Sequence, residues 1–334
     1  MAVYTQIDNP ELYFQVKLWE GEASSQGDGT TTAITFDGDE DMQPDMIWIK
    51  DRDASSWHDL TDSVRGVTKS IYPSQADAED TVATAVTAIG SNGFTVGSND
   101  QVNNGGNSFV AWCWKESATA GFDIVSYTGN GSARTISHSL SAVPKFIMVK
   151  NRESSENWRC YHVSNGNTHE IYLDLNNAKV DTDTAWNDTT PTSSVFSVGT
   201  NHGVNKDTEG LIAYLFAEKQ GYSKFGSYTG NGNADGPFIY TGFRPAFIMY
   251  KNTARAISWL IHDNKRLGYN VNNDEQHPDT TAADGTDDRA DILSNGFKIR
   301  EDSALMNTDG ETVIYAAFAE APLVNSNGVP CNAR

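Results

Sequence analysis

Short apolar runs alternate with polar, turn-forming segments along the whole chain. Runs such as FVAWCW (109–114) and KFIMVK (145–150) are rich in β-branched and aromatic residues, and segments such as TGNG and SNG separate them. Runs of roughly four to eight such residues between turn signals are typical of strands. Only TVATAVTAIG (81–90) could form a short helix, and its β-branched residues disfavour one. We therefore predict an all-β fold.

One apolar run occurs three times along the chain. PDMIWIKDRD (44–53) aligns with PKFIMVKNRE (144–153) and PAFIMYKNTA (245–254). The phrase SYTGNG precedes the second and third copies, whereas the first copy has KLWEGEASSQGDG (17–29), so we infer that the exact glycine pattern is not required. The run is apolar at successive positions, which indicates a central strand packed on both faces.

Further anchors recur in the same order and define a repeat of about 100 residues. They are Pro44, Pro144 and Pro245; Trp57, Trp158 and Trp259; Phe94, Phe196 and Phe297; Trp114, Phe216 and Phe318; and Glu116, Glu218 and Glu320. Units of this length are too long for solenoid repeats or propeller blades, but they match a small sandwich. We predict three tandem β-sandwich domains, lectin-like or jelly-roll-like, at 13–121, 122–221 and 222–322. Outside them lie residues 1–12, which we expect to form a docking arm, and a C-terminal tail at 323–334.

The three copies allow each repeated residue to be judged by what replaces it. Cys113 aligns with Leu215 and Ala317, and Cys160 with Ile261, which predicts core positions and not reactive thiols. The aligned tryptophans could be sugar-stacking platforms, but a core or inter-sheet role is favoured. The three glutamates are predicted to cap or solvate the ends of strands.

Charge and cysteine usage exclude several classes of protein. The 334 residues carry a formal charge of −20, which argues against a nucleic-acid partner and against an anionic membrane surface. No window approaches the roughly 20 apolar residues of a membrane span, and no secretory signal is visible. The three cysteines, with Cys331 in the tail, have neither close pairing nor metal-ligand spacing.

A search for catalytic motifs leads us to predict no catalytic, cofactor-binding or metal-binding residues, no cofactor and no enzymatic activity. Glu170 and Asp174 share a strand face but lie about 13 Å apart, which is too far for a glycosidase pair. The seven histidines are isolated, and His162 and His262 are one position out of register, so we expect them on opposite faces of their strands. The GNG segments lack the lysine of a phosphate loop and are expected to be turns.

Polar loops are the remaining candidates for recognition. The acidic stretches DGDED (37–41) and DGTDDRAD (284–291) are expected to be solvated loops, with a structural cation as the alternative. The copies diverge most at 58–93, 159–195 and 260–296, and variable loops on a repeated scaffold often carry binding. Trp186, isolated in such a loop, is the predicted ligand contact.

Several phrases of the chain resemble a known family. WIKDRD…DSVRGVTK, GFTVGS…AWCWKE and ADGPFIYTGFRPAFIM are similar to repeated-domain, tail-fibre-like virion proteins of tailed bacteriophages from marine and aquatic bacteria. The resemblance spans nearly the whole chain. It implies a structural protein on the exterior of the virion, a tail or baseplate fibre with lectin-like domains, and it brings no catalytic residues.

The partners that this resemblance implies are other virion proteins and a host cell-surface glycan or protein. Fibres are commonly homotrimers, so we expect a homotrimer. Two other classes stay open: a capsid decoration protein, and a polysaccharide depolymerase whose carboxylates meet between chains or domains.

Overall fold

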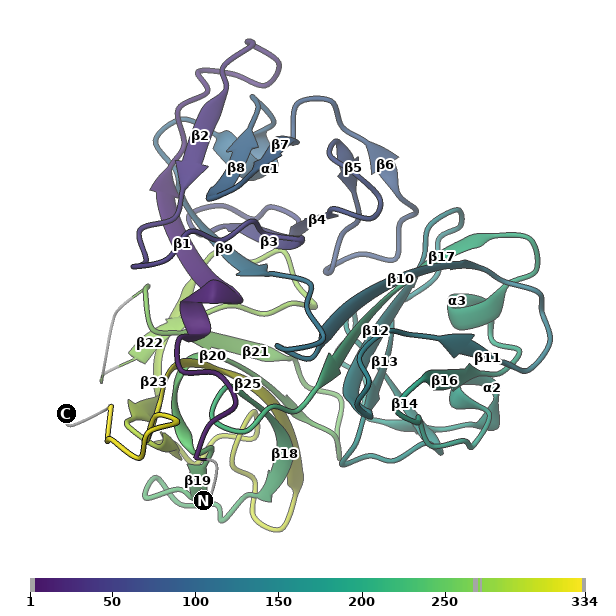
Figure 1. Cartoon of the computed structure of the whole chain (residues 1–334), viewed down its shortest axis with the longest axis vertical. Helices are drawn as coiled ribbons and strands as arrows, with labels where there is room; N and C mark the ends of the chain where they lie inside the picture. Colours follow the sequence, from purple (N-terminus) through teal and green to yellow (C-terminus); the bar gives the residue numbers. More distant parts are fainter. Residues whose placement is uncertain (1–3, 267–269, 271, 332–334) are drawn as a thin grey trace.

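The computed structural model describes residues 4–266, 270 and 272–331. The fold is all-β, as predicted, and consists of antiparallel sheets (Figure 1). Residues 81–90 contain strand β7 (Val86–Gly90) and no helix, in line with their β-branched content. The helices within the described residues are single turns: η1 (Pro10–Leu12), α1 (Asp100–Asn103), α2 (Asp183–Trp186) and α3 (His202–Asn205).

Three sheets share one strand order, and we call them sheets 1, 2 and 3. In each sheet, the first strand of a repeat pairs with the last strand of the same repeat. The last strand also pairs with the strand that contains the repeated apolar run, which we call the PAFIMY-type strand. A short strand pairs with the other edge of the PAFIMY-type strand. Sheet 1 contains β1 (Phe14–Glu20), β9 (Ser108–Trp114), β3 (Met46–Asp51) and β4 (Asp59–Asp62). Sheet 2 contains β10 (Phe122–Thr128), β17 (Gly210–Ala217), β12 (Pro144–Asn151), β13 (Arg159–His162), β14 (His169–Tyr172) and β15 (Val180–Asp181). Sheet 3 contains β18 (Ser223–Thr229), β25 (Thr312–Pro322), β20 (Phe243–Asn252) and β21 (Leu260–Asp263).

A smaller sheet packs on one face of each of these sheets. The small sheet of sheet 1 contains β2 (Thr32–Thr35), β8 (Gly93–Val96) and β7, and that of sheet 2 contains β11 (Arg134–Ser137) and β16 (Val195–Val198). The small sheet of sheet 3 contains β19 (Phe238–Tyr240), β24 (Gly296–Ile299), β23 (Gly285–Leu293) and β22 (Asn272–Glu275). A separate pair is formed by β5 (Lys69–Ser70) and β6 (Asp80–Thr81).

The PAFIMY-type strands are buried on both faces, as their sequence predicts. In β3, Ile47 and Ile49 pack in one apolar cluster with Phe94 of the small sheet. Met46 and Trp48, which alternate with them, belong to a different cluster that also contains residues of sheets 2 and 3. Each large sheet is therefore the middle layer between a small sheet and a core that all three sheets share.

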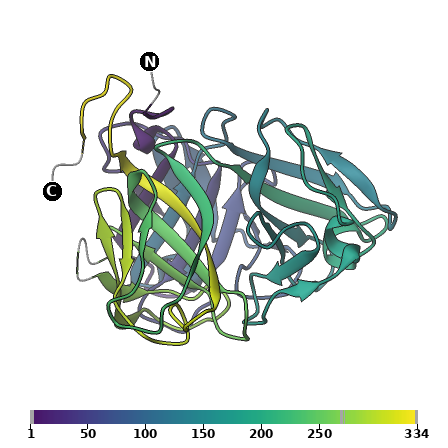
Figure 2. The same cartoon turned by 90° about the horizontal axis from the view of Figure 1, so that it is seen from below.

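The aligned aromatic residues at the ends of the last strands meet in this shared core. The ring centroid of Trp114 lies 6.2 Å from that of Phe216 and 5.5 Å from that of Phe318, and the two phenylalanine rings are 5.6 Å apart. Figure 1 shows the three sheets around a common centre, and Figure 2 shows them from the side. Because the sheets share one core, the division into separate domains at 122 and 222 stays a prediction.

Backbone hydrogen bonds join neighbouring sheets at three equivalent places, which we call seams 1/2, 2/3 and 3/1. The amide of Glu79 donates to the carbonyl of Arg152 (2.9 Å) at seam 1/2, and Lys179 donates to Thr253 (3.1 Å) at seam 2/3. At seam 3/1, the amide of Asp284 donates to the carbonyl of Arg52 (2.8 Å). Because the third contact returns to the first sheet, the three sheets form a closed ring with approximate threefold symmetry.

Strand pairing corrects the alignment of the tryptophans. The residues before β4, β13 and β21 are His58, Trp158 and Trp259, so Trp57 is one position out of register. The indole N–H groups of Trp158 and Trp259 donate to the carbonyls of Tyr72 (2.9 Å) and Tyr172 (2.7 Å). His58 takes the same role, with Nε2 3.2 Å from the carbonyl of His277. The predicted core role is confirmed for Trp158 and Trp259, and it is wrong for Trp57, which is partly exposed.

The SYTGNG phrase forms a turn that a buried asparagine holds. Asn205 Oδ1 accepts the amide of Asn130 (3.0 Å), and Asn307 Oδ1 accepts that of Asn231 (2.8 Å). A Cβ on Gly129 or Gly230, the first glycine of the phrase, would lie 2.0 or 2.2 Å from a backbone carbonyl oxygen. Gly21 is equally confined, at 2.1 Å, in the first copy. The inference that the glycine pattern is dispensable is therefore wrong for this one position.

The N-terminal segment packs against the rest of the chain. Ile7 belongs to the shared core, and Thr5 is buried and donates to the carbonyl of Gln220 (3.2 Å). The carboxylate of Asp8 accepts the amide of Ser326 (2.6 Å), which joins this segment to the C-terminal tail. Residues 5–12 therefore pack onto the fold, and the role of residues 1–12 as a docking arm stays a prediction.

Candidate binding cleft

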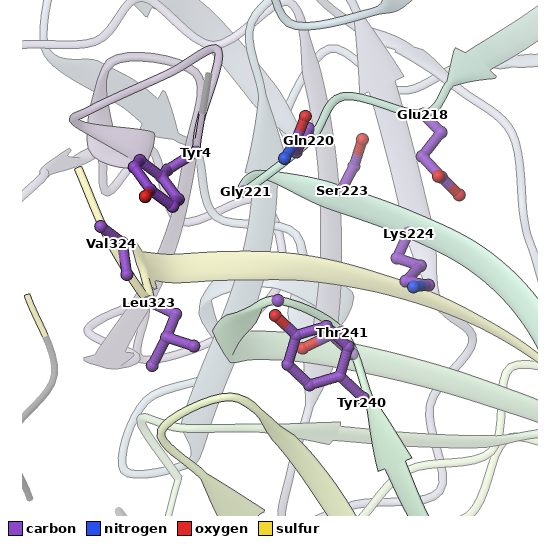
Figure 3. Close-up of a pocket in the computed structure, with 11 residues that line it drawn as sticks. Tyr4, Glu218, Gln220, Gly221, Ser223, Lys224, Tyr240, Thr241, Leu323 and Val324 are labelled. Carbon is purple, nitrogen blue, oxygen red and sulfur yellow. The ribbon is translucent and has the colours of Figure 1, made fainter. Parts of the chain in front are cut away.

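An open cleft of about 350 Å³ lies between sheet 3 and the two ends of the chain (Figure 3). Exposed Tyr4 and Tyr240 stand on its rim and are 51% and 53% accessible, although large aromatic side chains are usually mostly buried. Between them the wall carries charged and polar side chains. The lining residues are Tyr4, Glu218, Gln220, Gly221, Ser223, Lys224, Tyr240, Thr241, Gly242, Leu323 and Val324.

A tight turn after β19 fixes the position of Tyr240. Thr241 is buried, and its hydroxyl donates to the carbonyl of Phe243 (2.6 Å). Gly242 has a φ of +85°, which residues with a side chain rarely adopt. The turn therefore holds Tyr240 at the end of its strand, with the ring directed away from the sheet 3 core.

Lys224 lies on β18, at the side of the cleft that Tyr240 also lines (Figure 3). Its ammonium lies 5.7 Å from the centroid of the Tyr240 ring, a distance at which cation and ring attract each other. Glu218 lies on the same side of the cleft as Lys224 (Figure 3) and accepts the amide of Phe225 (3.3 Å) with one carboxylate oxygen. The cleft therefore combines aromatic faces, a cation and a carboxylate.

The equivalent positions on sheets 1 and 2 are closed by the chain itself. Strand pairing places Gln15 and Asp123 at the position of Lys224. The side-chain amide of Gln15 donates to the backbone carbonyls of Glu11 (3.0 Å) and Glu40 (2.9 Å). The carboxylate of Asp123 accepts the backbone amide of Ser139 (2.5 Å). Glu40 and Ser139 both lie on the loop that leads into the next central strand.

On sheet 3 that loop is shorter, which leaves the cleft open. The equivalent isoleucine and proline at its two ends are Ile34 and Pro44, Ile136 and Pro144, and Ile239 and Pro245 in the three copies. The separation falls from ten to eight to six positions. This shortening is a signal in the sequence, but its meaning depends on which strands pair.

The three repeated glutamates differ in their surroundings. Glu116 accepts the amide of Ile124 (3.2 Å), much as Glu218 accepts that of Phe225, so the predicted capping role is confirmed for both. Burial, together with a hydrogen bond to Asp123, raises the pKa of Glu116 to about 7. Glu320 instead pairs with Arg244 (2.9 Å).

Trp186, the predicted ligand contact, lies in the core and outside the cleft. It ends α2, whose first turn is capped by the Thr182 hydroxyl accepting the amide of Thr184 (3.2 Å). Its side chain is 2% exposed and packs against Tyr161 at a centroid distance of 6.0 Å. The expectation of an exposed loop aromatic is therefore wrong, because a helical turn folds this polar-looking segment onto sheet 2.

The other residues considered for chemistry are occupied within the fold. Glu170 pairs with Arg159 (3.1 Å), and Asp174 accepts the amide of Trp158 (3.1 Å). Cys113 and Cys160 are buried as predicted, and burial raises the pKa of both thiols well above the usual value.

The histidines and acidic stretches are also placed by the structure. His162 contacts the shared core while His262 lies against Tyr250 in the sheet 3 cluster, so their predicted opposite orientation is confirmed. Asp284, at the start of the second acidic stretch, pairs with Arg52 (2.6 Å) and Arg266 (2.9 Å). Within the described residues, no group of three or more potential ligands is arranged to hold a metal ion. No helix in the same part of the chain is long and apolar enough to cross a membrane.

Three buried lysines close the PAFIMY-type strands. Lys50, Lys150 and Lys251 are fully buried, and burial lowers the pKa of each to about 8. Lys150 donates to the carbonyl of Ala76 (2.6 Å), across seam 1/2. Because they occupy equivalent positions and donate to backbone carbonyls, these lysines support the scaffold in all three copies.

Fold and cleft define an all-β protein with a ring of three similar sheets and an open cleft with exposed aromatic residues near the chain ends. Residues 9–322 match the family described as domain of unknown function DUF7483, and the chain belongs to this family. The matched span includes all three sheets. No curated protein matches the chain.

Proposed function

We propose that the protein is a host-attachment protein on the exterior of a tailed-bacteriophage particle, as a tail or baseplate fibre, and that it binds a surface saccharide in the cleft. The proposal that the protein belongs to a phage particle rests on the resemblance of its sequence segments to tail-fibre-like virion proteins. The binding role rests on the cleft, which is open on sheet 3 and closed on sheets 1 and 2. Virion proteins and the host-surface saccharide are the partners, and a homotrimer is the proposed assembly.

The observation that carries the binding role is the pair of exposed tyrosines on either side of polar side chains. The C–H face of a pyranose packs against an aromatic ring, while its hydroxyl groups need donors and acceptors. Tyr4 and Tyr240 provide the rings, and Glu218, Gln220 and Lys224 provide the polar groups. A volume of about 350 Å³ lies at the lower end of the range for small-molecule sites and suits one or two sugar units.

The test is a glycan array followed by calorimetry on the saccharides that bind. Tyr240→Ala should weaken binding roughly tenfold, because loss of one stacked ring costs about 1 to 1.5 kcal/mol. Phe238→Ala is the matched control, since Phe238 is 46% exposed on the same strand but does not line the cleft. Equal affinities of the two variants, or binding that depends on Phe238, would contradict the proposal.

A further inference from the structure

We propose that the cleft selects saccharides that carry a carboxylate, such as uronic or sialic acids, and that Lys224 is the residue that recognises this group. The inference rests on the proposed saccharide binding and adds the chemical class of the ligand. It follows from the charge, surroundings and rigidity of Lys224.

Lys224 is a cation at a position where the two equivalent residues are neutral or negative. The side chains of Gln15 and Asp123 each form hydrogen bonds with the loop that leads into the central strand of their own sheet. The short loop of sheet 3 instead brings the Tyr240 ring to Lys224. A cation has therefore replaced a self-satisfied polar group at the one position of the three that opens to solvent.

Two other cations near this end of sheet 3 already have carboxylate partners. Arg244 pairs with Glu320 (2.9 Å), and Lys298 pairs with Asp235 (2.7 Å). Among the described residues, Lys224 forms no such ion pair, and its ammonium lies near the Tyr240 ring. Its ammonium keeps donors for a ligand that lies against the ring.

The backbone under Lys224 is rigid, which favours selective binding. Lys224 pairs with Ala317 inside the seven-residue ladder between β18 and β25. Its neighbours Ser223 and Phe225 are buried, and the Ser223 hydroxyl accepts the amide of Lys219 (3.0 Å). Little backbone freedom is therefore lost on binding.

A carboxylate fits these surroundings better than a phosphate monoester, which carries up to two charges. The ammonium of Lys224 is a single point charge and matches one singly charged group. Glu218 in the cleft and the chain's net charge of −20 also repel a doubly charged phosphate monoester more than a singly charged carboxylate. A sulfate ester carries one charge, and the experiment separates it from the carboxylate. Glu218 can accept hydroxyl protons from the same sugar.

The experiment compares acidic oligosaccharides with their carboxyl-reduced, neutral counterparts. The probes are oligomers of galacturonic, glucuronic and N-acetylneuraminic acid, each beside its reduced form, with sulfated and phosphorylated oligosaccharides included. The full chain should bind at least one acidic oligomer about tenfold more tightly than its reduced form, and added salt should weaken that preference.

Lys224→Gln, which installs the residue found at the equivalent position on sheet 1, should reduce the preference for the acidic oligomer over its reduced form from about tenfold to within about twofold. Lys298→Gln is the matched control and should keep the preference, because Lys298 is paired outside the cleft. Thermal unfolding of both variants checks that each is folded.

The possible outcomes separate the two proposals. If no saccharide binds to the wild-type chain, saccharide binding itself is overturned. If acidic and reduced forms bind equally, or Lys224→Gln weakens both alike, the carboxylate inference is overturned and saccharide binding stands. Tighter binding of a sulfated or phosphorylated oligosaccharide would overturn the choice of carboxylate.

Discussion

Seams 1/2 and 3/1 are built around buried charges, whereas seam 2/3 is built from neutral groups. At seam 1/2, Asp62 pairs with Arg65 (2.5 Å) and accepts the hydroxyl of Tyr214 (2.5 Å) on sheet 2. Glu79 extends this network to Arg152 (2.8 Å). The two side chains of the Asp62–Arg65 pair are completely buried.

Seam 3/1 repeats this arrangement with equivalent residues. Asp263 pairs with Arg266 (2.6 Å) and accepts the indole N–H of Trp112 (3.0 Å) on sheet 1. Asp284 then joins Arg266 (2.9 Å) to Arg52 (2.6 Å). The same three parts, a carboxylate with its arginine, an aromatic donor and a bridging acid, occur at both seams.

At seam 2/3, His162 occupies the position of the aspartate, and Asn165 occupies the position of the arginine. Ala316 stands where the other seams have Tyr214 and Trp112, and His162 Nε2 reaches past it to the carbonyl of Tyr315 (3.1 Å). Both amide atoms of Asn165 are buried without a hydrogen-bond partner among the described residues. The comparison teaches that one ring geometry can be closed by two kinds of chemistry, and that these should respond differently to mutation and pH.

The largest expected effect is the loss of a buried charge partner. Asp62→Ala leaves Arg65 buried beside an empty site and should lower the free energy of unfolding by about 3 to 5 kcal/mol, as removal of one partner of a buried pair does. Urea denaturation followed by tryptophan fluorescence measures this loss. Asp37→Ala is the control, because Asp37 pairs with Lys17 (3.2 Å) at 62% exposure and should cost less than about 1 kcal/mol. Similar losses in the two variants would remove the distinction between buried and surface charges.

The next effect concerns pH at seam 2/3. Burial lowers the pKa of His162 to about 4, although its hydrogen bond to the Tyr315 carbonyl opposes the shift. The unfolded chain therefore binds more protons than the folded chain between pH 6.5 and about 4. The contribution of neutral His162 to the free energy of unfolding is fully present above pH 6.5. It is lost as the pH falls through this window, by about 3 kcal/mol at most.

The non-titrating variant His162→Asn isolates this contribution. The wild type should lose more stability than the variant between pH 6.5 and pH 4, in denaturation series at both values. Parallel pH profiles for the two proteins would show that seam 2/3 has no such proton linkage.

The smallest effect tests the contact that all three seams share. Trp158→Phe at seam 1/2 and Trp259→Phe at seam 2/3 each remove one N–H donor from a backbone carbonyl and should each cost about 1 to 2 kcal/mol. Trp57→Phe should cost no more than about 0.5 kcal/mol, since Trp57 is partly exposed and one position out of register. Equal costs for Trp57 and Trp158 would restore the alignment that the strand pairing corrected.

Local sequence pattern predicted the strands well, because alternation, β-branching and turn residues act within a few positions. The double-sided burial of 245–250 and the core positions of Cys113 and Cys160 followed from the same reasoning. Trp186 was misplaced because its neighbours are polar, and only the packing of α2 between β14 and β16 buries it.

Candidate site residues were harder to predict than strands. Lys224 and Tyr240 lie in segments that look like their copies, and their proximity depends on β18 and β19 belonging to two different sheets. The shorter loop before Pro245 follows from the sequence, because Ile239 and Pro245 are fewer positions apart than their equivalents in the other two copies. Its consequence, an open cleft, required the position of the chain ends as well.

The sequence by itself determined the all-β class, the repeat of about 100 residues and the strands that are buried on both faces, since these depend on local propensity and on comparison within the chain. Only the tertiary structure decided that the sheets close into a ring around one core, that His58 replaces a tryptophan, and that the cleft opens on sheet 3 alone. These features depend on register and on contacts between residues a hundred or more positions apart, such as Asp8 and Ser326. No local pattern encodes such contacts.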